Sequence, residues 1–222
     1  MGMITFDFHS HILPGADHGA SDRNEAMTIL RAARAAGIET IAATPHFYPH
    51  RHRVEDFLKR REAAYHRIAE LCGEDTPKVL LGVEVLACEG IDQMQGIEKL
   101  TLEGTNIILW EMPFDISAHT DELFETAERL IENGYTLFMA HPNRYPTESV
   151  ERMVMLGAKL QLNMEDICSF RERSRAKRWV ANGWVYAVGS DVHHDEKIYK
   201  KFKKGARIVE PALEKINHPI DN

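Results

Sequence analysis

The chain has 222 residues, of which 44% are hydrophobic and 27% charged, and a formal net charge of -7 at pH 7. No run approaches the roughly 20 apolar residues of a membrane span, and the acidic balance argues against broad nucleic-acid binding. The N-terminus lacks a signal-peptide pattern, and the three distant cysteines indicate reduced thiols. We therefore expect a cytoplasmic protein without membrane insertion.

Seven short apolar runs predict strands at residues 4–8, 40–43, 79–85, 107–111, 136–140, 160–163 and 184–188. Between them the apolar period changes from about 2 to about 3.6 residues, which predicts amphipathic helices. Asp22 and Glu25 resemble the capping pair of the first helix, and Gly37 would end it. The stretch 86–104 predicts a loop with a short helix.

Strands that alternate with helices indicate βα units and a mainly parallel sheet. We found no linker, low-complexity tract or internal repeat, so one domain over residues 1–222 is the simplest organisation. Seven such units either close as an irregular barrel or stay open as a doubly wound sheet, and periodicity alone does not decide between them.

Metal-type side chains follow almost every predicted strand at its C-terminal end: His9, His11, His46, Glu84, Glu111, His141, Asp191 and His193. In a βα barrel these ends converge on one face. A single histidine at a strand end is more often solvated than a ligand. However, His9 and His11 are two residues apart, so both would face one side, and the carboxylates of Glu84 and Glu111 need positive partners in their apolar runs.

This mixture of ligand types narrows the kind of metal. Imidazole and carboxylate without thiolate suit manganese, iron or zinc. Eight or nine ligands exceed the needs of one ion, so we expect two or three, with Glu84 or another carboxylate as a bridge. Clustered divalent ions activate water and hold phosphoryl oxygens, which predicts a hydrolase.

The motifs "DFHSHILPG", "ATPH", "GVEV", "WEMP", "AHPNRY" and "GSDVHH", in this order, resemble the PHP (polymerase and histidinol phosphatase) superfamily. Within it, the sequence is similar to the bacterial tyrosine-protein phosphatases of the CpsB/CapC type. The resemblance implies a distorted (β/α)7 TIM-like barrel with the active site at the C-terminal ends of the strands. It also implies three metal ions, commonly manganese, and hydrolysis of phosphotyrosine in a membrane-associated tyrosine autokinase of capsule or exopolysaccharide synthesis.

The resemblance also implies roles for individual residues. His9 and His11 would bind one ion with Asp191, and Glu84 would bridge ions. A second ion would take Glu111 and His141, and a third His46 and His193. Arg144, in "HPNRY", would bind the phosphate.

Two positions depart from the pattern of these phosphatases. His18, preceded by Asp17, stands where they usually have an aspartate ligand. Other PHP branches use histidine there, so we expect His18 to bind the third ion. After "GSDVHH" the usual Arg-Pro segment is missing, which leaves Lys197 as the candidate for a second phosphate contact.

Some residues near the expected cleft have less defined roles. In the segment 46–53, Phe47 and Tyr48 could stack on a substrate ring while Arg51 and Arg53 attract phosphate, or the segment could be a solvated basic loop. His119 and His194 are candidate proton donors.

Three other functions remain open. One is a small-molecule phosphatase, such as histidinol-phosphate phosphatase. Another is an amidohydrolase-type C–N hydrolase, and the third is a non-catalytic metal-binding partner of a polysaccharide-assembly kinase. The C-x5-R loop of thiol-based tyrosine phosphatases is absent from the sequence.

Overall fold

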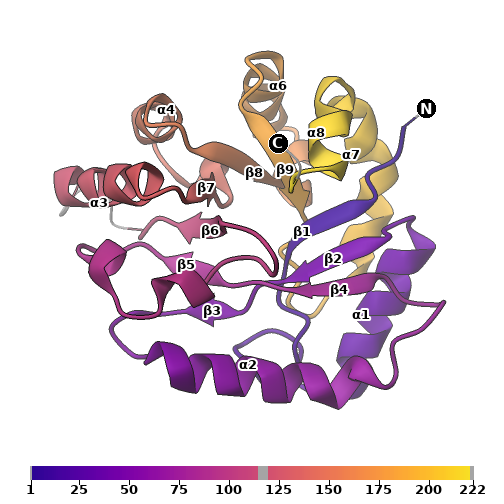
Figure 1. The fold of residues 1–222 in the computed structure, drawn as a ribbon. Helices are drawn as coiled ribbons and strands as arrows, with labels where there is room; N and C mark the ends of the chain where they lie inside the picture. Colours follow the sequence, from indigo (N-terminus) through magenta and orange to yellow (C-terminus); the bar gives the residue numbers. More distant parts are fainter. Residues whose placement is uncertain (1, 115–119, 221–222) are drawn as a thin grey trace.

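The computed structural model describes residues 2–114 and 120–220 and alternates strands with helices (Figure 1). The strands are β1 (Phe6–Ser10), β2 (Thr40–Ala43), β3 (His46–Phe47), β4 (Lys78–Leu81), β5 (Glu84–Leu86), β6 (Ile107–Glu111), β7 (Thr136–Met139), β8 (Lys159–Asn163) and β9 (Val185–Gly189). The α-helices are α1 (Arg23–Ala35), α2 (Val54–Ala69), α3 (Thr120–Glu132), α4 (Thr147–Met155), α5 (Met164–Cys168), α6 (Arg173–Ala181), α7 (Phe202–Ile208) and α8 (Leu213–Asn217). Short 3-10 helices are η1 (Ile91–Gln93), η2 (Ile97–Lys99), η4 (Pro142–Arg144), η5 (Glu196–Lys201) and η6 (Glu210–Ala212).

The strands form two parallel sheets, ordered β1-β2-β4 and β3-β5-β6-β7-β8-β9. The predicted strand 79–85 is thus divided: β4 belongs to the first sheet and β5 to the second. The sheets also approach each other at β1 and β9, where Ser10 forms a parallel bridge with Val192 and the His11 backbone N–H donates to the Val192 carbonyl over 2.9 Å. The α/β class with parallel strands is confirmed.

Helix α1 begins and ends where its sequence indicates. The Asp22 side chain accepts hydrogen bonds from the backbone N–H groups of Asn24 and Glu25, at 2.7 and 3.0 Å, which caps the helix. Gly37 follows the helix with a φ of 98°, a left-handed conformation that favours glycine. The Glu25 carboxylate reaches back to the Ser21 N–H at 2.7 Å, so the acidic pair does act at the helix start.

A compact apolar cluster is formed by side chains from several strands together with Leu102. It consists of Phe6, Phe8, Ala42, Leu80, Leu102, Ile107, Leu109, Phe138, Ala140 and Ala187. Four residues beyond Ala42 and Leu80, the chain reaches His46 and Glu84 at the starts of β3 and β5, where the two residues pair with each other in the second sheet. On β1 the pairing register with β2 shifts between Asp7 and Ser10, in the segment that contains Phe8 and His9.

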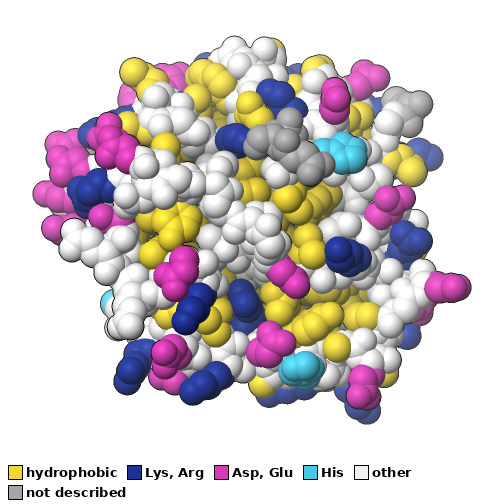
Figure 2. All heavy atoms as spheres, in the orientation of Figure 1, with side chains coloured by type: hydrophobic (Ala, Val, Ile, Leu, Met, Phe, Trp, Pro, Cys, Tyr) yellow, Lys and Arg dark blue, Asp and Glu magenta, His cyan; other side chains and the backbone are white. Residues whose placement is uncertain are grey.

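A larger apolar cluster lies between the strands and the helices, which run along the outside of the sheets in Figure 1. Acidic and basic side chains are interspersed over the face seen in Figure 2. Within residues 2–114 and 120–220, no helix combines the length and apolar character needed to cross a bilayer.

Candidate metal centre

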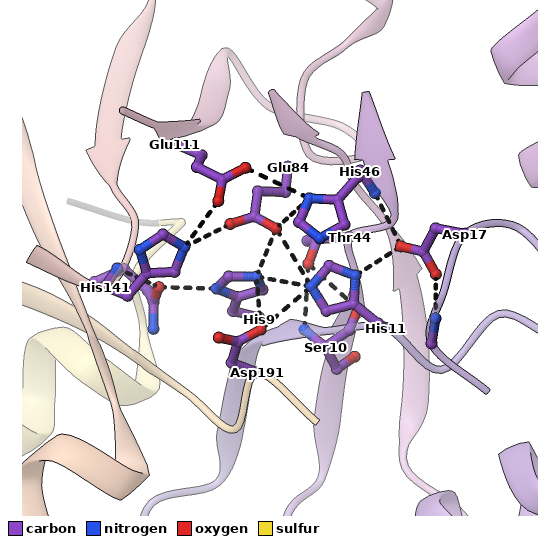
Figure 3. Close-up of polar contacts among 12 residues, drawn as sticks. His9, Ser10, His11, Asp17, Thr44, His46, Glu84, Glu111, His141 and Asp191 are labelled. Atoms are coloured by element: carbon purple, nitrogen blue, oxygen red, sulfur yellow. Dashed lines mark hydrogen bonds and ion pairs between the residues drawn. The ribbon is translucent and has the colours of Figure 1, made fainter. Parts of the chain in front are cut away.

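The buried carboxylate of Glu84, at the start of β5, is the centre of the polar cluster (Figure 3). Its Oε2 lies 3.2 Å from His9 Nε2, 3.3 Å from His11 Nε2 and 3.0 Å from His46 Nδ1. Its Oε1 lies 2.9 Å from His141 Nε2. Four imidazoles, from β1, β3 and the segments that follow β1 and β7, therefore converge on one carboxylate.

Two more carboxylates close the cluster on either side of Glu84. Asp191 Oδ1 lies 3.3 Å from His11 Nε2 and 3.6 Å from His9 Nε2. Glu111 Oε2 lies 3.5 Å from His46 Nδ1, and its Oε1 lies 3.6 Å from His141 Nε2. Negative oxygens and ring nitrogens thus alternate across a site whose residues are up to 182 positions apart in the chain (191 − 9).

The backbone is strained at two of these residues. His141, after β7, has a φ of 32° and Asp191, after β9, a φ of 53°. Among the described non-glycine residues these are the two with positive φ. Such a conformation costs about 1–3 kcal/mol and persists where the surroundings impose it, often at a functional site. At these turns the His141 side chain reaches Glu84, and the Asp191 side chain reaches His9 and His11.

His193 and His18 lie against the same cluster. The ring of His193 stacks on that of His11, with centroids 4.1 Å apart. The exposed His18 ring lies 4.8 Å from His46 and 4.6 Å from His193. Three groups have ligand atoms within 4.8 Å of one another: His11, His46 and His193; His9, His11 and Glu84; and His46, Glu84 and Glu111. His18 belongs to none of these three groups.

Asp17, the alternative ligand to His18, makes hydrogen bonds with three neighbouring residues. Its Oδ2 lies 2.7 Å from His11 Nδ1 and accepts from the His46 backbone N–H over 3.0 Å, while Oδ1 accepts from the Gly19 N–H. This contact directs His11 Nε2 toward Glu84. Burial opposes ionisation of Asp17, but the bond and charge of His11 outweigh it and lower the pKa.

Burial and charge act in opposition throughout the cluster. Burial lowers the pKa of His46, but its close contacts with the Glu111 and Glu84 carboxylates outweigh this and raise the pKa to about 9. Burial raises the pKa of Glu84, yet the His9 charge and its imidazole bonds hold that pKa well below the usual range. For His193, burial and the nearby His11 charge together lower the pKa to about 4.

The donor set fits divalent metal ions. His46 Nδ1 and Glu84 Oε2 are both buried and face each other, but neither has a hydrogen-bond partner within the described part of the chain. Buried polar atoms normally have a bonding partner, and a metal ion between these two atoms would serve as a partner for both. Imidazole nitrogens beside carboxylate oxygens, without thiolates, are the ligands of manganese, iron or zinc.

Arg144 lies at the edge of this centre. Its Nη2 donates to Asp191 Oδ2 over 2.7 Å, its Nη1 lies 4.0 Å from Glu111 Oε1, and the side chain is 37% exposed. Arg175, on α6, donates to the carbonyls of Asn143 and Tyr145, the residues on either side of Arg144. The guanidinium is therefore held next to the candidate ligands and remains open to solvent.

Two buried carboxamide side chains belong to the cluster but were not among the site residues predicted from the sequence. Gln161 and Asn163 lie on β8, and Gln161 Oε1 is 3.0 Å from His9 Nδ1, while Asn163 Nδ2 donates to Asp191 Oδ2 over 2.8 Å. The alternating polar residues of "LQLN" in an apolar strand were the available signal, because both side chains share one face.

The structure gives different answers for the residues to which the sequence assigned less defined roles. The expectation that Phe47 could stack on a substrate is wrong, because its ring is fully buried and packs against Phe57 with centroids 5.2 Å apart. Tyr48 is partly exposed and stacks on His46, with centroids 5.3 Å apart. His194 pairs with Glu25 on α1 at 2.9 Å, and His119 lies outside the described residues.

Comparison with known proteins places this arrangement in context. A family model described as "Capsular polysaccharide synthesis, CpsB/CapC" matches residues 5–218. The tyrosine-protein phosphatase YwqE of Bacillus subtilis (strain 168) is 33% identical over 199 residues, 85% of this chain and 77% of that protein. The tyrosine-protein phosphatase CpsB of Streptococcus agalactiae serotype III is 23% identical over 203 residues, 85% of this chain and 82% of that protein.

Solved structures show the same relationship. A structure from work on YwqE of Bacillus subtilis and CpsB of Streptococcus pneumoniae, described as unique metal-dependent tyrosine phosphatases, superposes with a TM-score of 0.74 at 26% identity, covering 92% of this chain and 86% of the other. Histidinol phosphate phosphatase from Lactococcus lactis superposes with a TM-score of 0.56 at 12% identity, covering 95% and 94%, and shares the fold.

Proposed function

Because the chain belongs to the CpsB/CapC capsular polysaccharide synthesis family, we propose that it is a metal-dependent phosphatase that hydrolyses phosphotyrosine in proteins. The observation that carries this proposal is the convergence of four imidazoles on the Glu84 carboxylate, with Arg144 beside it. The relatives YwqE and CpsB are named tyrosine-protein phosphatases, which supports this substrate class.

The proposed ligands are His9, His11 and Asp191 for one ion, Glu111 and His141 for a second, and His46 and His193 for a third, with Glu84 as bridge. His18 is the remaining candidate ligand, near His46 and His193. This ligand set would suit two or three divalent ions. We propose manganese as the preferred metal, with iron or zinc as alternatives. When bound, such ions lower the pKa of a water and neutralise charge on phosphoryl oxygens.

The residues of the chain would orient the substrate and balance its charge. Arg144 uses Nη2 on Asp191, and the other N–H groups of its planar guanidinium suit the oxygens of a phosphoryl group. The partly exposed ring of Tyr48 lies over His46 and could contact the phenyl ring of the substrate. A phenolate leaves readily, so the reaction places little demand on a general acid.

Three further features belong to the same proposal. The bridge between Ser10 and Val192 supports closure of the two sheets into a distorted (β/α)7 barrel as one domain. The substrate would be a tyrosine-phosphorylated protein, such as a membrane-associated tyrosine kinase of capsule or exopolysaccharide synthesis. The enzyme would act in the cytoplasm, where the phosphorylated segments of such a kinase would lie.

The test compares substrates on the manganese-loaded protein. Phosphate release from a phosphotyrosine peptide should exceed release from histidinol phosphate in kcat/KM, and His9→Ala should abolish both. Peptide turnover no better than that of the small ester would favour a small-molecule phosphatase. A protein that binds metal but releases phosphate from neither substrate, nor from p-nitrophenyl phosphate, would be a non-catalytic metal-binding protein.

A further inference from the structure

The strand β8 contributes carboxamides to the centre, and these form a continuous chain of hydrogen bonds behind two candidate ligands. His9 Nδ1 lies 3.0 Å from Gln161 Oε1, and Gln161 Nε2 donates to Asn163 Oδ1 over 3.1 Å. Asn163 Nδ2 then donates to Asp191 Oδ2 over 2.8 Å. The chain therefore joins the far side of His9 to the far side of Asp191.

The direction of these hydrogen bonds is fixed by their partners. Gln161 Oε1 also faces the His141 backbone N–H at 3.3 Å, and a backbone N–H can only donate, so the oxygen end of this amide points toward His9. His9 must then donate from Nδ1, which leaves Nε2, on the side of Glu84 and Asp191, as the nitrogen available to a metal ion.

At the other end, Asn163 settles the orientation of the Asp191 carboxylate. Its amide accepts from Gln161 and donates to Asp191 Oδ2, an atom that Arg144 also contacts at 2.7 Å. Both of these donors hold the same oxygen. The other oxygen, Oδ1, therefore stays turned toward His11 Nε2 at 3.3 Å.

The packing around the amide leaves space for this contact. Gly189, on β9, pairs with Asn163 across the sheet. A Cβ at Gly189 would collide with the Cβ of His9 and would come within 2.8 Å of Gln161 Nε2. Because glycine has no Cβ, position 189 leaves the space in which the side chains of His9 and Gln161 make contact. His9 and Gln161 are both fully buried.

We propose that Gln161 and Asn163 are positioning residues that set the tautomer of His9 and the orientation of Asp191, so that Nε2 and Oδ1 face one metal ion. This inference rests on the proposed metal centre. A histidine ligand commonly donates its second N–H to a fixed acceptor, and loss of that acceptor costs about 10- to 100-fold in metal affinity or activity. Here a neutral carboxamide fills that role and links it to a second ligand.

The test measures metal affinity and the state of His9 separately from catalysis. Gln161→Met removes both amide groups at similar length, and its Kd for Mn²⁺ should rise by about 10- to 100-fold. Gln161→Glu keeps an acceptor for His9 but loses the donor to Asn163, so it should recover part of the affinity. In ¹⁵N NMR spectra of the Zn²⁺-loaded protein, the Nδ1 proton of His9 should exchange slowly in wild type and in Gln161→Glu, but not in Gln161→Met.

The matched control is Leu162→Met, between the two carboxamides on the same strand but on its opposite face. This variant should bind Mn²⁺ as wild type does. If Gln161→Met does not fold, judged by circular dichroism, Asn163→Ala takes its place and should also raise the Kd.

The outcomes separate this inference from the proposed activity. Wild-type Mn²⁺ affinity in Gln161→Met or in Asn163→Ala, with the slow His9 proton retained, would overturn the positioning role and leave the proposed phosphatase intact. A wild-type protein that binds Mn²⁺ tightly but does not hydrolyse phosphotyrosine would lose its proposed activity, while weaker binding by the variants would still support the positioning role. If the wild-type protein binds no metal, both the positioning role and the proposed phosphatase activity are contradicted.

Discussion

Arg144 and Asp191 are joined by a 2.7 Å contact between Nη2 and Oδ2, so a solvent-accessible cation is held directly beside a candidate metal ligand. A guanidinium in this place can donate hydrogen bonds to phosphoryl oxygens while the carboxylate keeps its other oxygen for an ion. The pair also brings the η4 segment to the end of β9. In the proposed phosphatase, Arg144 would thereby couple phosphate binding to the orientation of Asp191.

The first prediction concerns Arg144→Ala. Removing a charged donor to the phosphoryl group should lower kcat/KM for a phosphotyrosine peptide by about 100- to 1,000-fold. Arg144→Lys should recover little of the loss, because an ammonium cannot bind two oxygens in a planar fork. Metal content should stay that of wild type, since Asn163 still holds Asp191 Oδ2. Steady-state kinetics and elemental analysis measure the two effects.

Arg152→Ala is the matched control for this experiment. Arg152 makes a similar ion pair, 2.6 Å from Asp121 Oδ1, on the exposed surface between α4 and α3. Its loss should leave kcat/KM unchanged. Equal losses in the two variants would mean that Arg144 has no special role at the phosphate.

The second prediction concerns Glu84→Gln. The amide would offer one oxygen and two N–H groups to four imidazole nitrogens that now face a carboxylate, so it cannot act as an anionic bridge. We expect loss of tightly bound metal and a fall in kcat/KM of at least about 100-fold. Elemental analysis of the purified variant reads the first effect and peptide hydrolysis the second.

The control for this variant is Glu62→Gln. Glu62 is exposed on α2 and pairs with His66 at 3.4 Å. It should keep wild-type metal content and activity. Full metal occupancy in Glu84→Gln would show that the centre does not depend on the bridge.

The third prediction is that metal uptake releases protons. Bonds and charges of the carboxylates raise the pKa of His9, His11 and His46 against the effect of burial, for His46 to about 9. The metal-free centre therefore holds protons at pH 7 that an incoming ion must displace. Apparent affinity for Mn²⁺ should rise from pH 6 to pH 8. Titration calorimetry at pH 7 in buffers of different ionisation enthalpy measures the proton count, and a binding heat that is independent of the buffer would contradict it.

The same pKa values predict how the metal-free protein responds to pH. A histidine whose pKa is raised on folding stabilises the native state below its unfolded pKa near 6.5, and this contribution is lost as pH rises through the folded pKa. The unfolding temperature of the metal-free protein should therefore fall between about pH 6.5 and 9. The metal-loaded protein, whose histidines are already deprotonated, provides the comparison and should not show this fall.

The sequence predicted those parts of the molecule that depend on local pattern. Alternation of apolar runs placed the strands, and β2 and β6 have the predicted bounds. The polar residues at strand ends identified the cluster around Glu84, because side chains at the C-terminal ends of parallel strands must meet. Both results follow from periodicity and chain direction.

Other features depend on geometry that no local pattern carries. The break between β4 and β5 divides one apolar run between two sheets, and the pairing of β1 with β2 is irregular between Asp7 and Ser10. Phe47, although it directly follows His46, is fully buried in the core. Neutral residues such as Gln161 were missed because a search for metal-type side chains passes over carboxamides.

The last prediction concerns the buried support of β1. Asp7 is fully buried; its Oδ1 accepts from the backbone N–H groups of Ser190 and His9 at 2.8 and 3.3 Å, and its Oδ2 accepts from the Tyr199 hydroxyl at 2.7 Å. Tyr199→Phe removes the donor to Oδ2 and leaves a buried carboxylate oxygen short of a partner. Its free energy of unfolding should fall by about 1–3 kcal/mol. Urea denaturation of the metal-free protein measures this, with Tyr186→Phe, which keeps the ring packed near Lys159 and Phe138, as the matched control. Equal stability of the two variants would show that Tyr199 contributes only its ring, and that the link between β1 and the segment after β9 depends on the backbone bonds of Asp7.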